Sequence, residues 1–306
     1  MTDAQFALAL DYGFSSWSDL RDTVTWSDPR VTELLNGVYR YRYDLLRISP
    51  HLRDQRPFAH SPLTIEQHFR NQYHNEVQSL QTLQGCDYAP TLLDEDPEHL
   101  TLTVEDVGDV KSPQDAEESL ATSVRRLAEL HGIVDGLELS LRPCWHTEVS
   151  EAWYFCWPRR KREQLADTDF REVIEQADSL PTLAEGFPQR FGHGEPGGNT
   201  AWRGGEARFF GFDNARIRQQ MVDVEDLLAV HSGRGERPHF ADWIGWWGVY
   251  AAHRAGCTDL DFREFLYLSL RRSSRRLAKP GAISSDWRQW QIERAIGCLR
   301  ELGRLT

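Results

Sequence analysis

A glycine-rich polar loop followed by a short aromatic segment constrains this sequence more than any other feature. The loop, residues 191–199, reads FGHGEPGGN, and the aromatic segment at residues 208–212 leads directly into Asp213 and Asn214. Glycines permit backbone conformations that other residues avoid, so the loop can bring a histidine, a carboxylate and a carboxamide close together. A general base and oxygen ligands for Mg²⁺ are the groups that phosphoryl transfer needs. On residue types alone, a glycine-rich turn between two strands explains the same pattern.

The order of the other elements indicates a small β-rich region followed by a mainly helical one. Asn36-Gly37 between two alternating apolar segments is a strong hairpin signal, and residues 45–48 fit a third strand. A helix, two strands and a second helix are then predicted at residues 64–83, 89–93, 100–108 and 116–131. Gly132 is expected to stop the second helix. The sequence therefore predicts an α+β protein.

The C-terminal part is predicted to be helical. Residues 145–180 read as mostly helical, and three further helices are expected to close the chain. The first of these three carries an aromatic stripe at helical spacing: Trp243, Trp246, Trp247 and Tyr250. Such a wall can hold a cation against its ring faces. Helical spacing favours the other interpretation, a stripe that packs in the core.

Composition limits the classes of partner. The chain has 306 residues and is 40% hydrophobic, which suits one large domain or two lobes. A net charge of −12 argues against nucleic-acid binding. Five scattered cysteines without metal-site spacing predict reduced thiols, hence a cytoplasmic protein. The sequence contains no signal peptide and no long apolar run, so neither secretion nor a membrane partner is expected.

The loop and the aromatic segment together resemble the paired signature of the aminoglycoside phosphotransferase and choline kinase group, whose fold is that of protein kinases. In that group the loop reads H-x-D-x-x-x-x-N, and the second segment reads as apolar residues, Asp, an aromatic residue and an acid. Four residues of this chain fit: His193, Asn199, Phe212 and Asp213. Three features depart from the pattern, because Glu195 replaces the catalytic Asp, Asn199 comes one residue early and Gly211 replaces the metal-binding Asp.

The resemblance implies a nucleotide site on the β-rich region. Arg47, on the predicted third strand, would hold the phosphates of ATP, since no lysine precedes Lys111 and a guanidinium binds phosphate in a bidentate way. Glu76, within the first predicted helix, would orient that cation. Glu105 and Val107 lie where the family binds adenine through backbone groups between its lobes.

The resemblance also implies roles for the loop residues. Glu195 and His193 are the candidate catalytic residues, and Glu195 would take the proton of the acceptor hydroxyl. Asn199 and Asp213 would hold the Mg²⁺ that the family gives to position 211. We expect residues 208–212 to form a strand, which places Asp213 on the same side of the chain as position 211. We also expect that the substitution Gly211→Asp adds the missing ligand without disturbing its surroundings.

Residues 222–228 resemble the family segment in which an aspartate caps a helix and braces the catalytic loop. The resemblance thus predicts a two-lobed, protein-kinase-like fold: a helical extension at residues 1–30, a nucleotide-binding N-lobe at 31–108 and a helical C-lobe at 109–306. Two functions remain open. One is an ATP-dependent kinase of a hydroxyl-bearing small molecule or peptide, with a rearranged site. The other is an inactive phosphotransferase fold that binds or scaffolds a protein partner.

Overall fold

The computed structural model describes residues 31–35, 38–42, 63, 65–109, 116–144, 186–232, 238–277 and 285–305. Three predictions lie outside these residues: the extension at 1–30, the third strand with Arg47, and the helical segment at 145–180.

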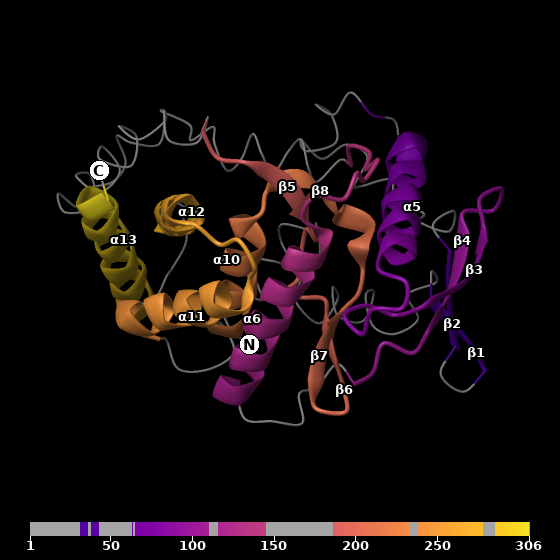
Figure 1. The fold of residues 1–306 in the computed structure, drawn as a ribbon, viewed down its shortest axis with the longest axis horizontal. Helices are drawn as coiled ribbons and strands as arrows, with labels where there is room; N and C mark the ends of the chain where they lie inside the picture. Colours follow the sequence, from indigo (N-terminus) through magenta and orange to yellow (C-terminus); the bar gives the residue numbers. More distant parts are fainter. Residues whose placement is uncertain are drawn as a thin grey trace.

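The small lobe is a four-stranded antiparallel sheet with one helix beside it (Figure 1). Its strands follow the spatial order β1, β2, β4, β3, with bounds Val31–Leu35, Val38–Arg42, Thr101–Glu105 and Leu92–Asp96 respectively. The predicted hairpin is confirmed, because β1 pairs with β2 in a register that sets Leu35 opposite Val38. The strand predicted at 89–93 starts three residues later. Pro90 cannot donate to a ladder, and the carbonyl of Ala89 accepts a hydrogen bond from Arg208 instead.

The helix of the small lobe, α5 (Ile65–Thr82), turns its apolar face inward. The predicted face is buried at five positions: Phe69, Tyr73, Val77, Leu80 and Leu83. The polar side chains of the same helix point at the large lobe, where Asn75 donates to the carbonyl of Ala215 over 3.1 Å. The helix therefore joins the sheet to the residues that follow the aromatic segment.

The large lobe combines five helices with two short antiparallel pairs of strands among the described residues. The helices are α6 (Ala116–Val134), α10 (Met221–Ser232), α11 (Phe240–His253), α12 (Asp259–Leu277) and α13 (Ser285–Leu305). Strand β5 (Gln189–Gly192) pairs with β8 (Arg216–Gln219), and β6 (Thr200–Arg203) pairs with β7 (Glu206–Phe209). Figure 1 shows α6 between these strands and the three C-terminal helices. The α+β class and the two-lobed arrangement are as the sequence predicts.

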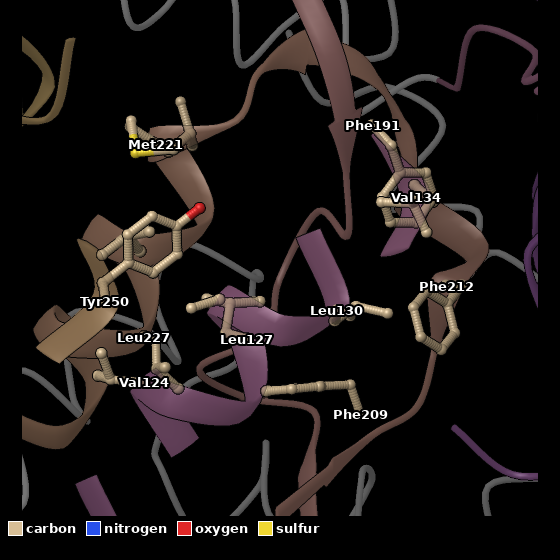
Figure 2. Packing of buried hydrophobic residues seen from close by; sticks show 14 of the residues in the cluster. Val124, Leu127, Leu130, Val134, Phe191, Phe209, Phe212, Met221, Leu227 and Tyr250 are labelled. Atoms are coloured by element: carbon tan, nitrogen blue, oxygen red, sulfur yellow. The ribbon is translucent and has the colours of Figure 1, made fainter. Parts of the chain in front are cut away.

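Helix α6 is the centre of the core. Its side chains Val124, Leu127, Leu130 and Val134 belong to one buried cluster with Phe191, Phe209, Phe212 and residues of α10 and α11 (Figure 2). The prediction that Gly132 stops this helix is wrong, since the helix continues to Val134. Gly136, with φ of 83°, supplies the left-handed residue just past the end.

The aromatic stripe on α11 is a core face. Trp243, Trp247 and Tyr250 are buried, and the ring of Trp243 stacks on Phe265 with centroids 6.5 Å apart. The indole N–H of Trp243 donates to the Ser269 hydroxyl over 3.2 Å, so its polar atom is satisfied inside the core. Of the two interpretations of this stripe, core packing is confirmed.

We expect Trp243→Ala to lower the free energy of unfolding by about 3–5 kcal/mol, because it leaves a cavity and an unpaired Ser269 hydroxyl. Trp246→Ala is the matched control, since Trp246 is only partly buried against the same cluster. Urea unfolding followed by circular dichroism measures both. Equal losses in the two variants would contradict the assignment of Trp243 to the core.

Candidate functional site

The glycine-rich loop connects β5 to β6 and is held in place by two aspartates of α10. The backbone N–H groups of His193 and Gly194 donate to the two carboxylate oxygens of Asp223, over 2.5 and 3.2 Å. Farther along the loop, the N–H of Gly197 donates to Asp226 over 3.2 Å. Residues three apart lie on one face of a helix, so both carboxylates point at the loop. The acidic segment at 222–228 thus braces the loop at two places.

Asp223 is also the centre of a buried charge network. Its carboxylate forms an ion pair with Arg218, and its Oδ2 lies 3.3 Å from Nε2 of His131. The other ring nitrogen of His131 lies 2.7 Å from the hydroxyl of Tyr250 on α11. Burial opposes ionisation of Asp223, but Arg218 and His131 outweigh it and hold the pKa of the carboxyl well below its ordinary value. The acceptor that holds the loop is therefore a carboxylate at neutral pH.

His193 itself faces the core. Its ring is fully buried, with its centroid 4.4 Å from that of Phe212 and 6.1 Å from that of Phe209. Its Nδ1 accepts the N–H of Glu195 over 3.3 Å. Burial lowers the pKa of the imidazole to about 4, so the ring is neutral at pH 7. These contacts suit a histidine that positions the loop and the aromatic segment.

The side chain of Asn199 lies over Gly211, the position at which the family has its metal-binding aspartate. A Cβ placed on Gly211 would lie 3.0 Å from Nδ2 and 3.2 Å from Cγ of Asn199. Gly211 also has φ of 70° and ψ of 54°, in the left-handed region. The expectation that Gly211→Asp leaves its surroundings undisturbed is wrong, because Asn199 would have to move. The carboxylate of Glu195, four residues before Asn199, is exposed to solvent.

Asp213 is not on a strand. Strand β7 ends at Phe209, and residues Phe212–Asn214 form a 3₁₀ turn named η3. With about three residues per turn, the side chains of positions 211 and 213 point in different directions, so the predicted alternation is wrong. The left-handed Gly211 ends the extended chain and starts this turn. Asp213 instead accepts the side-chain N–H of Gln72, from α5, over 3.0 Å.

These donors include one carboxylate, that of Asp213, for the Mg²⁺ site that the resemblance implies. No group of three or more His, Cys, Asp or Glu side chains suited to a metal ion occurs within the described parts of the chain. Magnesium prefers one or two carboxylates with water and phosphate oxygens in octahedral geometry. Here position 211 has no carboxylate, and that of Asp213 is engaged by the small lobe.

Glu76 is buried at the contact between α5 and η3. It is 5% exposed, and the backbone N–H groups of residues 211–213 hydrogen-bond to its carboxyl. Its Oε2 has no hydrogen-bond partner within the described residues. Burial and the nearby Asp213 raise the pKa of Glu76 well above its ordinary value, although those N–H groups oppose the shift. Since Arg47 lies outside the described residues, its pairing with Glu76 stays a prediction.

The segment after β4 leads from the small to the large lobe. The carboxylate of Glu105 accepts hydrogen bonds from Arg208 over 2.6 Å and from the N–H of Thr91 over 3.1 Å. Burial alone would raise the pKa of Glu105, but these bonds lower it to about 2. Within the described residues, Val107 makes no backbone hydrogen bond. Arg208 and Gln72 were missed from the sequence, which gives no sign of what a distant polar side chain contacts.

We expect Asp223→Ala to lower the free energy of unfolding by about 3–5 kcal/mol, because it leaves the charge of Arg218 buried without its partner. It also removes the acceptor of two loop N–H groups, so the amides of His193 and Gly194 should exchange with deuterium faster. Asp94→Ala, at an exposed position on β3, is the control and should change neither quantity. Unaltered exchange in folded Asp223→Ala would contradict the bracing role.

Two solved structures share this arrangement. An aminoglycoside phosphotransferase from Alicyclobacillus acidocaldarius superposes with a TM-score of 0.54 at 14% identity, over 92% of this chain and 91% of that one. A microcompartment-associated aminopropanol kinase gives a TM-score of 0.52 at 13% identity, over 90% of this chain and 87% of that one. No protein-family model matches the sequence, and no curated protein is detectably similar to it.

At these identities the likeness concerns the fold alone. It extends over both lobes, so the resemblance seen in the sequence is confirmed at the level of architecture. No helix among the described residues is long and apolar enough to cross a membrane. The chain has the two-lobed, protein-kinase-like fold of the small-molecule phosphotransferases.

Proposed function

We propose that this chain is a nucleotide-binding protein of the phosphotransferase fold that does not carry out Mg²⁺-dependent phosphoryl transfer. The observation that carries this proposal is at Gly211, where the family's metal-binding aspartate is missing. The carboxamide of Asn199 lies 3.0 Å from the position that a Cβ at residue 211 would occupy. Such a protein would act by binding a protein partner that responds to the bound nucleotide.

Two features support nucleotide binding at the junction of the lobes. Val107 has a backbone N–H and C=O without partners among the described residues, and adenine presents a neighbouring acceptor and donor on one edge. The buried carboxyl of Glu76, with one oxygen unpaired among the described residues, suits a partner for the cation that would hold the phosphates. Arg47 is our candidate for that cation.

The case against transfer rests on what the reaction needs. In phosphoryl transfer the protein mainly positions the reactants, and bound metal ions neutralise the charge of the phosphates. A misplacement of about 1 Å can lower the rate on the order of 10²-fold. A chain that lacks one carboxylate and directs the next towards Gln72 lacks the means to place the metal.

A second candidate function is ATP-dependent transfer to a hydroxyl of a small molecule or peptide. The observation in its favour is Glu195, which is exposed in the glycine-rich loop. The loop residues Gly194 and Gly197, on either side of it, are both hydrogen-bonded to α10. A general base has to be held within hydrogen-bond reach of its proton, and such a loop offers that. The names of the two similar structures agree with a small-molecule acceptor. Cytoplasmic localisation fits the four free cysteines among the described residues.

For the first function, we expect isothermal titration to give dissociation constants for ATP that differ by less than about threefold between Mg²⁺ and EDTA. Asp213→Asn, which keeps the size of the side chain, should leave that ratio unchanged. Binding that is at least about tenfold tighter with Mg²⁺, and that loses this gain in Asp213→Asn, would establish a metal role for Asp213. The proposal of a nucleotide site fails if ATP and ADP both give no heat and no thermal stabilisation.

For the second function, Glu195→Gln should lower kcat by about 10²–10⁴-fold and leave the Kd for ATP unchanged, because it removes the base but not the shape of the loop. The assay is release of ADP with a panel of amino alcohols, aminoglycosides and hydroxyl-bearing peptides. Glu98→Gln, at an exposed turn, is the control. Equal turnover in the two variants would exclude Glu195 as the base.

A further inference from the structure

Arg208, on β7 of the large lobe, contacts both the connection between the lobes and the loop that precedes β3. Its side chain donates to the carbonyl of Ala89 over 2.5 Å, to Oε1 of Glu105 over 2.6 Å and to the carbonyl of Asp106 over 3.3 Å. The residue is 2% exposed. Because a guanidinium is planar and presents several donors in fixed directions, one side chain can hold all three acceptors at once.

The far end of this connection is fixed by the backbone of β6. The N–H of Asp109 donates to the carbonyl of Trp202 over 2.9 Å, and the N–H of Trp202 donates back over 2.7 Å. Gly108, with φ of 104°, lies so close that a Cβ would be 2.2 Å from the carbonyl oxygen of Trp202. Only glycine fits there. Residues 105–109 are thus held at both ends by the hairpin of β6 and β7.

Val107 lies between these two fixed ends and has no backbone hydrogen bond within the described residues. An N–H and a C=O without partners, on a segment fixed at both ends, are organised in advance for a ligand, so little ordering has to occur on binding. The ligand that suits them is flat and offers an acceptor next to a donor. Adenine has such an edge, with a ring nitrogen that accepts beside an amino group that donates. In hypoxanthine the two roles are exchanged, because its ring N–H donates and its carbonyl accepts.

The same strand also connects this segment to the glycine-rich loop. Next to Arg208, the N–H of Phe209 donates to the carbonyl of Tyr88 over 2.8 Å. One residue farther, the N–H of Phe210 donates to the carbonyl of Asn199 over 3.1 Å. Arg208 therefore holds the segment at 105–109, and Phe210, two residues farther along the chain, holds the glycine-rich loop.

We propose that Arg208 is a positioning residue for base recognition, which holds residues 105–109 so that the backbone of Val107 selects an adenine edge. This inference rests on the proposed nucleotide site. Glu105 acts in it as the charged anchor of Arg208, since its Oε1 lies 2.6 Å from the buried guanidinium.

The experiment compares wild type with Arg208→Gln, Arg208→Lys and the control Arg203→Gln. Arg203 contacts the other oxygen of Glu105 over 3.3 Å but is 57% exposed. Two quantities are measured: amide exchange of residues 105–109 in the free protein, and dissociation constants for ADP, inosine diphosphate and inorganic tripolyphosphate. We expect Arg208→Gln and Arg208→Lys to speed the exchange by about tenfold and to weaken ADP binding by about tenfold. Their preference for ADP over inosine diphosphate should fall, whereas their dissociation constant for tripolyphosphate should equal that of wild type. Arg203→Gln should match wild type in both measured quantities.

Each other result overturns one statement. Equally weakened binding of ADP and tripolyphosphate would show that Arg208 only supports the fold. Amide exchange and base preference as in wild type, in both Arg208 variants, would also contradict the positioning role. If Arg208→Gln does not fold by circular dichroism, Arg208→Lys decides, because lysine keeps the charge beside Glu105 without the three directed contacts. A wild type that binds none of the three probes overturns the proposed nucleotide site. If, in that case, amide exchange of residues 105–109 is also unchanged in the Arg208 variants, the role of Arg208 in holding this segment is overturned too.

Discussion

The carboxylate of Asp223 is the interaction on which the rest of the site depends. It is buried, and it accepts the N–H groups of His193 and Gly194 while it pairs with Arg218 and His131. A buried ion costs free energy to desolvate and is tolerated only when several donors surround it. Here those donors come from the loop, from β8 and from α6. The loop, a sheet and the central helix are thus fixed to one another through a single side chain on α10.

The structure separates the shape of a phosphotransferase site from its chemistry. The loop is braced, His193 packs on Phe212, and the chain turns at position 211 through a left-handed residue. The brace and the turn are requirements of backbone geometry, and the left-handed position 211 favours glycine over aspartate. The ligands for a metal are a separate requirement, which depends on side chains. This chain satisfies the first and departs from the second, which is why the fold is secure and the proposed function is binding.

The hairpin of β6 and β7 gives this site its rigidity. On one side Arg208 holds the connection between the lobes and Phe209 holds the loop before β3, and on the other Phe210 holds Asn199. Motion of one lobe against the other would break several buried hydrogen bonds at once, each of which leaves an unsatisfied polar group. These bonds therefore resist such motion in the free protein. A rigid site of this kind suits recognition of one flat base more than it suits closure around varied acceptors.

The sequence by itself determined the architecture. The Asn-Gly hairpin, the apolar face of α5, the stripe of Trp243 and Tyr250 and the spacing of the loop are local patterns, and local patterns follow from periodicity and turn chemistry. Arg47 and residues 1–30 stay predictions, because they lie outside the described residues. Only the tertiary structure decided that Asp213 turns towards Gln72, that Asn199 covers Gly211 and that Arg208 holds Glu105. Those contacts join residues far apart in the chain, and the position of a side chain relative to a distant partner is fixed by packing, which no local pattern records.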